Sequence, residues 1–167
     1  MVWAFFNPVD GALATTLVAK PVTTLRARAL RFLALREHSR QELQRKLAPY
    51  VVDGDDLEAL LDDLAARGWL SELRLAESAA RVKSRRFGPL KVAQLLRARG
   101  LGDEIIAAGL RAAGADGAGS IEGIWRGRFR NLPADEREKA RQVRFLQGRG
   151  FPLDEIFRFL RALERSP

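Results

Sequence analysis

Apolar residues recur along this chain at the spacing of an α-helix, and the alternation typical of β-strands is scarce. From residue 24 onward the large apolar side chains fall three or four positions apart, which places them on one face of a helix. The clearest example is a set of four leucines: Leu57, Leu60, Leu61 and Leu64. Glycines and prolines interrupt the periodic stretches, as expected at helix ends. The pattern therefore predicts an all-α fold of short helices joined by brief turns.

One pattern of a helix, a glycine stop and a second helix with an acidic start occurs twice, about fifty residues apart. Residues 95–106 read LLRARGLGDEII, and residues 145–157 read FLQGRGFPLDEIF. The Arg-Gly pair at 99–100 corresponds to the Arg-Gly pair at 149–150, and an Asp-Glu-Ile run follows each pair. A period of this length is typical of tandem repeats, which act through their surfaces rather than through a buried pocket.

The breaks in the helical pattern divide the chain into three units of three helices each. We predict repeat 1 over residues 24–70, repeat 2 over 71–114 and repeat 3 over 120–165, with a glycine-rich linker at 115–119. Residues 1–23 are apolar and aromatic at their start, but they lack the basic start of a secretory signal. Their apolar run is also too short to span a membrane. We therefore expect a loose or lightly packed leader.

Local patterns predict where individual side chains lie. Residues 39–42 read SRQE and match a capping box, in which the serine and the glutamate satisfy free backbone N–H groups at the start of a helix. Helical spacing predicts that Val82 lies on the buried side of the first helix of repeat 2. Trp69 is expected to pack back onto repeat 1. Leu153 and Phe157 reproduce the spacing of the buried leucines of repeat 1, and we expect them in the core of repeat 3.

The composition is strongly basic, with 29 Lys and Arg against 21 Asp and Glu and a formal net charge of +8. This balance favours a polyanion or an acidic protein groove as the partner. Hydrophobic residues make up 47% of the chain, which is enough to form a core. The chain contains no cysteine, which excludes disulfides, thiolate metal ligands and cysteine nucleophiles and fits the reducing cytoplasm.

No pattern in the chain predicts catalysis or a metal site. His38 is the single histidine and has no cysteine or second histidine with which to share a transition metal. We expect it to be a solvated residue or a turn residue. The carboxylates of residues 53–63 lie near helix starts or on a polar helix face, where negative charge offsets the helix dipole. The glycines of residues 114–119 lack the Lys-Ser/Thr of a phosphate-binding loop. We therefore predict a non-enzymatic protein with no cofactor.

Basic residues gather in three stretches. Residues 81–99 contain seven and no acid, residues 126–130 contain three beside Trp125, and residues 137–144 contain four. Trp125 is expected in the core. A solvated face is one interpretation of these stretches, but uninterrupted like charge repels itself along a helix and so favours a binding surface. The predicted partner-binding residues are Arg74, Arg81, Arg85, Arg86, Lys91 and Arg97 in repeat 2, with Arg128, Lys139, Arg141 and Arg144 in repeat 3.

Three longer motifs follow one another along the chain. They are R-x-x-S-x-x-E-L-x-x-K-L at 36–47 followed by GWLSE at 68–72, then RRFGP at 85–89, and finally EKARQVRFL at 138–146 running into RGF at 149–151. In this order the motifs resemble those of the RecX family, small bacterial regulators of the RecA recombinase. The resemblance covers residues 24–163, which is nearly all of the chain beyond the leader.

The resemblance implies an all-helical, elongated and curved array of three three-helix repeats. It also implies a non-enzymatic regulator of homologous recombination and DNA repair that lodges in the groove of the RecA–DNA filament, where it slows ATP hydrolysis and strand exchange. We expect a cytoplasmic monomer that makes no contact with membranes. Two alternatives remain from the residues themselves: a basic helical module that binds single- or double-stranded DNA directly, and a helical adaptor for an unrelated acidic partner.

Overall fold

Helices account for the regular structure of this protein throughout the described residues, which are 23–115, 120–129 and 131–165 of a computed structural model. They form nine α-helices and one short 3-10 helix, with no strand among these residues. The predicted leader, apart from Thr23, and the predicted linker, apart from Ala115, lie outside the described residues.

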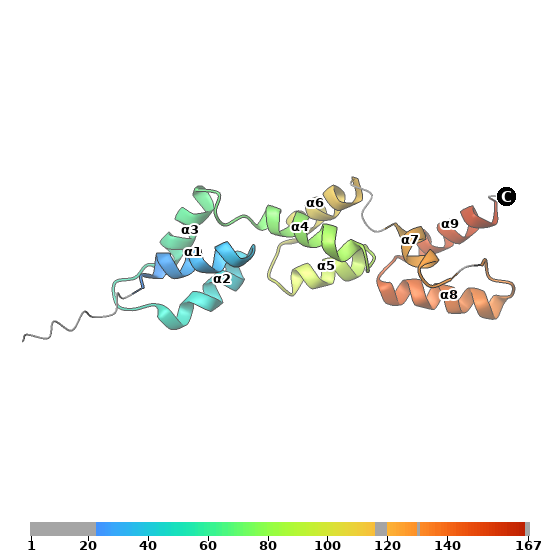
Figure 1. The fold of residues 1–167 in the computed structure, drawn as a ribbon, viewed down its shortest axis with the longest axis horizontal. Helices are drawn as coiled ribbons and strands as arrows, with labels where there is room; N and C mark the ends of the chain where they lie inside the picture. Colours follow the sequence, from blue (N-terminus) through green and yellow to red (C-terminus); the bar gives the residue numbers. More distant parts are fainter. Residues whose placement is uncertain (1–22, 116–119, 130, 166–167) are drawn as a thin grey trace, which may run out of the picture.

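The helices fall into three groups that follow one another along the chain and in space (Figure 1). Repeat 1 contains α1 (Leu25–Leu35), α2 (Arg40–Leu47), the 3-10 helix η1 (Ala48–Tyr50) and α3 (Leu57–Ala66). Repeat 2 contains α4 (Glu72–Ser84), α5 (Pro89–Arg97) and α6 (Asp103–Ala115). Repeat 3 contains α7 (Ile121–Arg126), α8 (Glu136–Arg149) and α9 (Leu153–Glu164).

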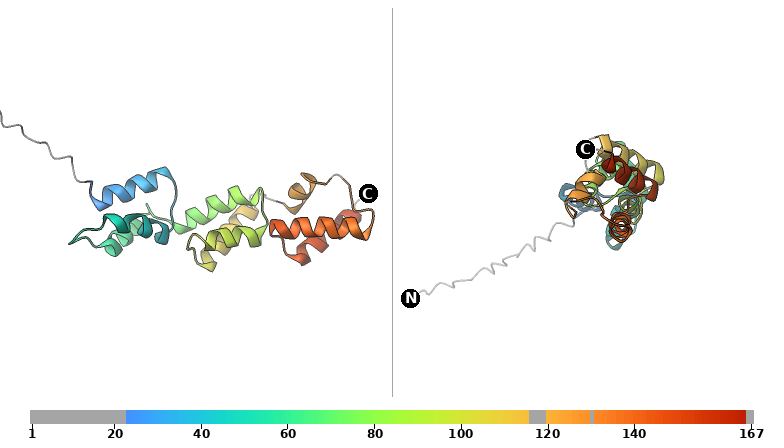
Figure 2. Two further views of the ribbon diagram at one scale, coloured as in Figure 1. Left: turned by 90° about the horizontal axis from the view of Figure 1, so that it is seen from below. Right: turned by 90° about the vertical axis from the view of Figure 1, so that its right-hand side faces the viewer.

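The three repeats stand in single file along one axis and overlap when the molecule is viewed along that axis (Figure 2). This arrangement confirms the predicted all-α array of three tandem three-helix repeats. The second helix of each repeat, α2, α5 or α8, lies at a boundary with a neighbouring repeat, because the turn after α5 meets the N-terminus of α2 and the C-terminal end of α8 meets the N-terminus of α5.

Each repeat encloses a hydrophobic core of its own. Leucines dominate in repeat 1, and Trp125, which is buried as expected, joins large aliphatic and aromatic side chains in repeat 3. The fully buried side chains include Leu43, Leu47, Leu61 and Leu64 in repeat 1, Val92 in repeat 2, and Leu146 and Ile156 in repeat 3. Burial of one such side chain contributes about 1.5–3 kcal/mol. The repeats are therefore stabilised mainly from within, and the seams between them depend on other interactions.

Side-chain caps explain where many of the helices begin. Ser39 accepts a hydrogen bond from the N–H of Glu42 while the Glu42 carboxylate accepts one from the N–H of Ser39, which confirms the predicted capping box. Further side-chain caps start most of the other helices: Thr24, Asp56, Ser71, Ser120 and Asp135. In contrast, α5 begins at Pro89 after Gly88, with no side-chain cap.

The burial of five residues differs from the sequence-based prediction. Val82 is 62% exposed, because the buried face of α4 is centred on Ala76 and Ala80 and Val82 lies beyond its edge. Leu153 and Phe157 are exposed for the same reason, because α9 buries the face that carries Ile156 and Leu160. The remaining two residues are Trp69, which is 44% exposed with its ring against the guanidinium of Arg67, and His38, which is buried.

Candidate partner-binding surface

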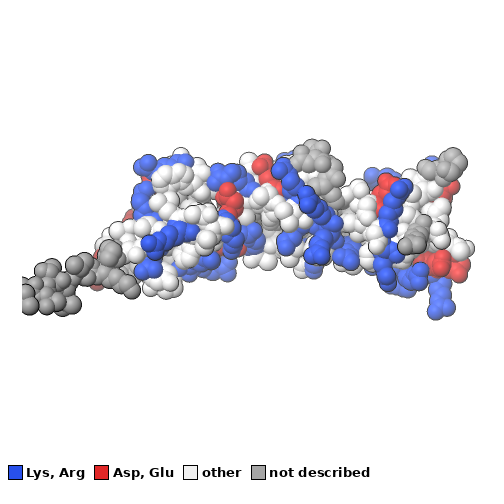
Figure 3. Space-filling model, viewed as in Figure 1, with Lys and Arg blue, Asp and Glu red and all other residues white. Residues whose placement is uncertain are grey.

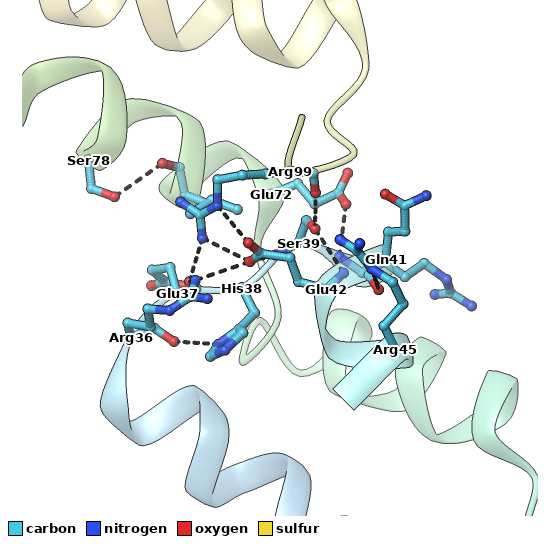
Figure 4. A network of polar contacts seen from close by, with 12 residues as sticks. Arg36, Glu37, His38, Ser39, Gln41, Glu42, Arg45, Glu72, Ser78 and Arg99 are labelled. Atoms are coloured by element: carbon cyan, nitrogen blue, oxygen red, sulfur yellow. Dashed lines mark hydrogen bonds and ion pairs between the residues drawn. The ribbon is translucent and has the colours of Figure 1, made fainter. Parts of the chain in front are cut away.

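The seam between repeats 1 and 2 is a network of charged and polar contacts (Figure 4). Arg99, in the turn that follows α5, donates from Nε and Nη2 to the two carboxylate oxygens of Glu42, each at 2.9 Å. Its carbonyl oxygen accepts a hydrogen bond from the hydroxyl of Ser39. Arg74 of α4 pairs with Glu37 at 2.8 Å, across the same seam. The contacts join residues that lie far apart in sequence, so they form only when the two repeats dock.

Glu42 is the centre of this network, and its side chain is only 13% exposed. Burial of the carboxyl by itself would raise its pKa. Hydrogen bonds from Arg99 and Arg36 outweigh that effect and lower the pKa of Glu42 to about 2. The carboxylate is therefore charged at any physiological pH and holds the two arginines at the seam.

His38 lies against this network rather than in solvent. It is 1% exposed, and its Nδ1 donates a hydrogen bond of 2.8 Å to the carbonyl oxygen of Arg36. Its Nε2 is buried with no hydrogen-bond partner among the described residues. Burial lowers the pKa of His38, as do the nearby charges of Arg36 and Lys46. The ring is therefore expected to be neutral at pH 7 and to act as a packing residue beside Phe32.

The seam between repeats 2 and 3 is built from backbone contacts. The N–H of Gly88 donates to the carbonyl oxygen of Arg149 at 2.8 Å, and the N–H of Leu90 donates to that of Gly150 at 3.0 Å. Gly150 has a φ of 93°, a conformation that favours glycine. A Cβ atom at Gly88 would lie 2.6 Å from the oxygen of Gly150, so the two chain segments touch too closely for a side chain at position 88.

Several of the predicted binding residues of repeat 2 have partners inside the protein. Arg74 holds the first seam, as described above, and Arg97 pairs with Asp103 at 2.7 Å. Lys91 donates to Gln94 at 3.2 Å, and Arg81 also interacts within the protein. Arg85 and Arg86 differ from these residues, because they are exposed and form no ion pair with any described residue. These two follow α4 and lie at the second seam.

Three hollows on the surface bring together the remaining predicted residues other than Lys139. The junction hollow, of about 250 Å³, lies between repeats 2 and 3 and is lined by Arg85, Arg86, Gly123, Ile124, Gly127, Arg128, Phe145 and Arg149. The bridging hollow, of about 200 Å³, includes both Arg128 and Arg141. The α8 hollow, of about 400 Å³, is lined by Asp135, Arg137, Glu138, Arg141 and Arg144. Neighbouring hollows share a residue, so they follow one another across the surface.

We call the arginines of these hollows the basic surface: Arg85, Arg86, Arg128, Arg137, Arg141, Arg144 and Arg149. Two of its members lie over aromatic rings, with Arg141 5.6 Å from the centroid of Phe129 and Arg149 5.0 Å from that of Phe145. Lys139 is not part of it, because it lines none of the three hollows. It pairs with Glu136 at 3.8 Å instead. Basic side chains also extend over all three repeats on the face seen in Figure 3.

Arg149 and Arg137 belong to the basic surface although they are absent from the predicted binding residues. The sequence contained a signal for Arg149, because it corresponds to Arg99 in the repeated Arg-Gly pair. That correspondence predicts a position at a seam. Arg137 lies in the third basic stretch, and only the fold shows that it lines the same hollow as Arg141.

The described residues contain no group of three or more histidines, aspartates or glutamates arranged to hold a metal ion. None of their helices has the length and apolar character that a crossing of the lipid bilayer requires. The features that distinguish the described surface are therefore its arginines and the two seams.

Family models for the first, second and third three-helix domains of RecX match residues 26–64, 71–110 and 120–160. Regulatory protein RecX of Leptothrix cholodnii is 44% identical over 147 residues, covering 88% of this chain and 94% of the relative. Regulatory protein RecX of Chromobacterium violaceum is 47% identical over 133 residues, covering 80% and 86%. The crystal structure of RecX from Lactobacillus salivarius has the same fold, with a TM-score of 0.69 at 18% identity over 87% of this chain and 97% of that one. Because the three domain models match in order and the relatives align over most of both chains, this chain belongs to the RecX family of regulatory proteins.

Proposed function

We propose that this protein is a non-enzymatic regulator of homologous recombination and DNA repair that binds in the groove of the RecA–DNA filament and slows ATP hydrolysis and strand exchange. The observation that carries the proposal is the basic surface, which continues from one repeat to the next across the second seam. Family membership supports a regulatory role. The proposed setting is the cytoplasm, with the protein acting as a monomer because each repeat closes its own core.

A row of linked repeats suits a polymeric host. A helical filament presents the same groove surface again and again, so that modest contacts from successive repeats act together through a high effective concentration. Arginine suits such contacts because its planar fork can bind a carboxylate or a phosphate with two hydrogen bonds. The filament groove would offer both kinds of group, from the recombinase and from DNA.

The arginines of the basic surface are proposed to make the main contacts. Arg85, Arg86 and Arg128 have no carboxylate partner among the described residues and are therefore available to a filament. We assign a smaller share to Arg74 and Arg97, because each is already paired with a carboxylate of this protein. Removal of either would therefore change the protein's own structure as well as its binding.

The test measures ATP hydrolysis and strand exchange by RecA on single-stranded DNA, with the protein added in amounts up to one molecule per recombinase. We expect wild type to slow both reactions and R141A/R144A to do so only at a severalfold higher concentration. The matched control is R126A/R158A, which removes the same charge from two arginines that pair with Glu122 and Asp154 within their own helices. Unchanged rates with wild-type protein would contradict the proposal.

The second candidate function is direct binding to DNA without recombinase. It is favoured by the junction hollow, where four arginines meet without an acidic residue. Phosphate contacts release counterions, so direct binding should weaken steeply as salt rises. Tight binding to filaments with weak binding to naked DNA would exclude this candidate as the main function. Equal affinity for both would favour it.

A further inference from the structure

We propose that the junction hollow between repeats 2 and 3 is a binding site for a phosphate group, supplied by the phosphodiester backbone of DNA. The site joins Arg85 and Arg86 of repeat 2 to Arg128 and Arg149 of repeat 3. The choice of DNA as the source rests on the proposed function. The site itself rests on the geometry and charge of the hollow.

The hollow has the size and charge that a phosphate requires. Its volume of about 250 Å³ exceeds that of a single water, which occupies about 30 Å³ of liquid, several times over. Four of the eight lining residues are arginines, and none is acidic. Four cations around one opening repel one another, and an anion that enters removes this repulsion.

The arginines of the hollow retain unused hydrogen-bond donors. Arg85, Arg86 and Arg128 form no side-chain hydrogen bond or ion pair with any described residue. Two exposed arginines of repeat 3 outside the hollow are paired instead, Arg126 with Glu122 at 2.7 Å and Arg158 with Asp154 at 3.1 Å. The guanidinium groups of Arg85, Arg86 and Arg128 therefore stay available to a ligand, whereas those of Arg126 and Arg158 already bind carboxylates.

Helix ends explain how the cluster is tolerated when it is empty. Arg85 caps the C-terminus of α4, Arg149 ends α8, and Arg128 follows α7 by one residue beyond its cap. A helix C-terminus favours a nearby cation by about 0.3–1 kcal/mol. This stabilisation requires the charge alone, so the five N–H donors of the Arg85 and Arg128 guanidinium groups stay available for a ligand.

Contacts of the second seam fix the position of the repeat 2 side of the hollow relative to the repeat 3 side. Besides the backbone bonds at Gly88 and Leu90, the Nη1 of Arg149 donates to the carbonyl oxygen of Arg86 at 3.4 Å. The guanidinium of Arg149 also lies over the ring of Phe145. A site that is already formed loses less conformational freedom on binding, which raises affinity.

Phosphate fits this donor set better than a carboxylate does. A carboxylate has two oxygens and is satisfied by one or two guanidinium forks. A phosphodiester also offers two oxygens to one guanidinium fork. In DNA it is followed by further phosphates, which neighbouring arginines can contact. Arg128 also lines the bridging hollow together with Arg141, so a DNA strand that enters the junction hollow would continue toward α8.

The test uses the full-length protein without recombinase, and it measures fluorescence anisotropy of a short labelled single-stranded DNA over a series of salt concentrations. We expect R85A/R128A to reduce the slope of log affinity against log salt by roughly 1.4, because each lost phosphate contact removes about 0.7. The control R126A/R158A removes the same charge and should reduce the slope by less than half of that. Equal reductions in the two variants would overturn the proposal.

A lysine variant and two competing anions sharpen the test. R85K/R128K should keep the salt slope but bind severalfold more weakly, because an ammonium lacks the bidentate fork. If R85K/R128K binds the DNA as tightly as wild type, positive charge alone accounts for binding and the proposed site is overturned. Pyrophosphate, measured by thermal stabilisation, and polyglutamate, measured by binding, serve as the competing anions. If R85A/R128A loses its response to either anion but binds DNA as tightly as wild type, the assignment of DNA is overturned.

The outcome is distinguishable from failure of the proposed function, because recombinase is absent from these measurements. Loss of DNA binding in R85A/R128A supports the site even where the ATPase assay shows no regulation. Conversely, unchanged DNA binding overturns the site and leaves filament binding through Arg141 and Arg144 to be judged by the ATPase and strand-exchange assays.

Discussion

At both seams of this molecule the later repeat contributes an Arg-Gly pair, but the residues that this pair contacts in the earlier repeat differ. Arg99 and Gly100 approach the N-terminus of α2, and Arg149 and Gly150 approach the N-terminus of α5. The third residue of the receiving helix is Glu42 in the first seam, where it binds Arg99. In the second seam the same position is Lys91, a second cation. The first seam is therefore neutralised, and the second is left positive.

The difference lies in which contacts hold each pair of neighbouring repeats together. In the first seam an acid at the third helical position serves as a cap and as a partner for Arg99, so the charge is used to dock the repeats. In the second seam Gly88 and Gly150 dock the repeats through the backbone, and Arg149 has no carboxylate partner among the described residues. A seam that is held by backbone contacts leaves its cations available to an outside partner.

The largest effect is expected from Glu42→Lys, which gives the first seam the charge of the second. Breaking a largely buried ion pair costs about 3–5 kcal/mol, because the remaining charges keep no partner. We expect the free energy of unfolding, measured in urea by far-UV circular dichroism, to fall by about 4 kcal/mol. The control Glu164→Lys makes the same charge change at the exposed end of α9 and should cost almost nothing. Equal losses would contradict the assigned role of Glu42.

Acidification should weaken the first seam through the same residue. Glu42 has a pKa of about 2 in the folded protein and an ordinary value of 4.5. A lowered folded pKa stabilises the fold above pH 4.5, and this contribution disappears as the pH falls toward 2. We expect the free energy of unfolding, measured in urea, to be about 3 kcal/mol higher for wild type than for Glu42→Gln at pH 7. This difference should shrink below pH 4.5. A difference that is the same at pH 7 and pH 3 would show that the carboxylate charge is not the cause.

A smaller effect is expected from Gly150→Ala, which attacks the backbone contacts of the second seam. The left-handed conformation costs a non-glycine residue about 1–2 kcal/mol, and the new Cβ would lie 2.6 Å from the backbone nitrogen of Lys91. We expect the free energy of unfolding, measured in urea, to fall by about 2 kcal/mol or more. Gly148→Ala is the matched control, because that position is helical with nothing within 4 Å, and alanine there should stabilise by about 0.5–1 kcal/mol. A stabilising Gly150→Ala would rule out the described contact.

The smallest effect on stability is expected from Lys91→Glu, which gives the second seam the acid of the first. An exposed pair with Arg149 would contribute less than about 1 kcal/mol. Its effect on binding should be larger, since a carboxylate would then compete with a phosphate for the arginines of the junction hollow. We expect severalfold weaker binding to single-stranded DNA by fluorescence anisotropy. The matched control is Lys46→Glu, which makes the same charge change at an exposed position of α2 in repeat 1 that lines none of the three hollows. Unchanged DNA affinity would contradict the prediction that a carboxylate at position 91 competes with phosphate for the arginines of the junction hollow.

The local parts of this structure could be predicted from the sequence. Capping at Ser39 and Glu42 depends on residues three positions apart, and the buried leucines of α3 follow helical spacing. The repeated Arg-Gly pair predicted tandem units. The burial of His38 could not be predicted in this way, because it depends on how α1 lies over the turn before α2. The exposure of Val82 is similar, since the spacing places it near the buried face but packing decides where that face ends.

Among the candidate binding residues, the sequence identified the basic stretches but not the state of each arginine. Arg74 and Arg85 look alike in sequence, yet Arg74 meets Glu37 from another repeat and Arg85 meets no acid among the described residues. An ion pair between residues 37 positions apart leaves no local pattern. The same holds for the junction hollow, whose arginines come from two repeats.

By itself the sequence determined the helices, their caps, the repeat and the excess of positive charge, because each of these depends on neighbouring residues or on composition. The tertiary structure decided which arginines are neutralised and which remain available. That decision depends on the docking of one repeat against the next, which brings Glu42 to Arg99 and Lys91 to the neighbourhood of Gly150. Charges interact over a few ångströms in space, and such distances between distant residues are set only when the repeats pack.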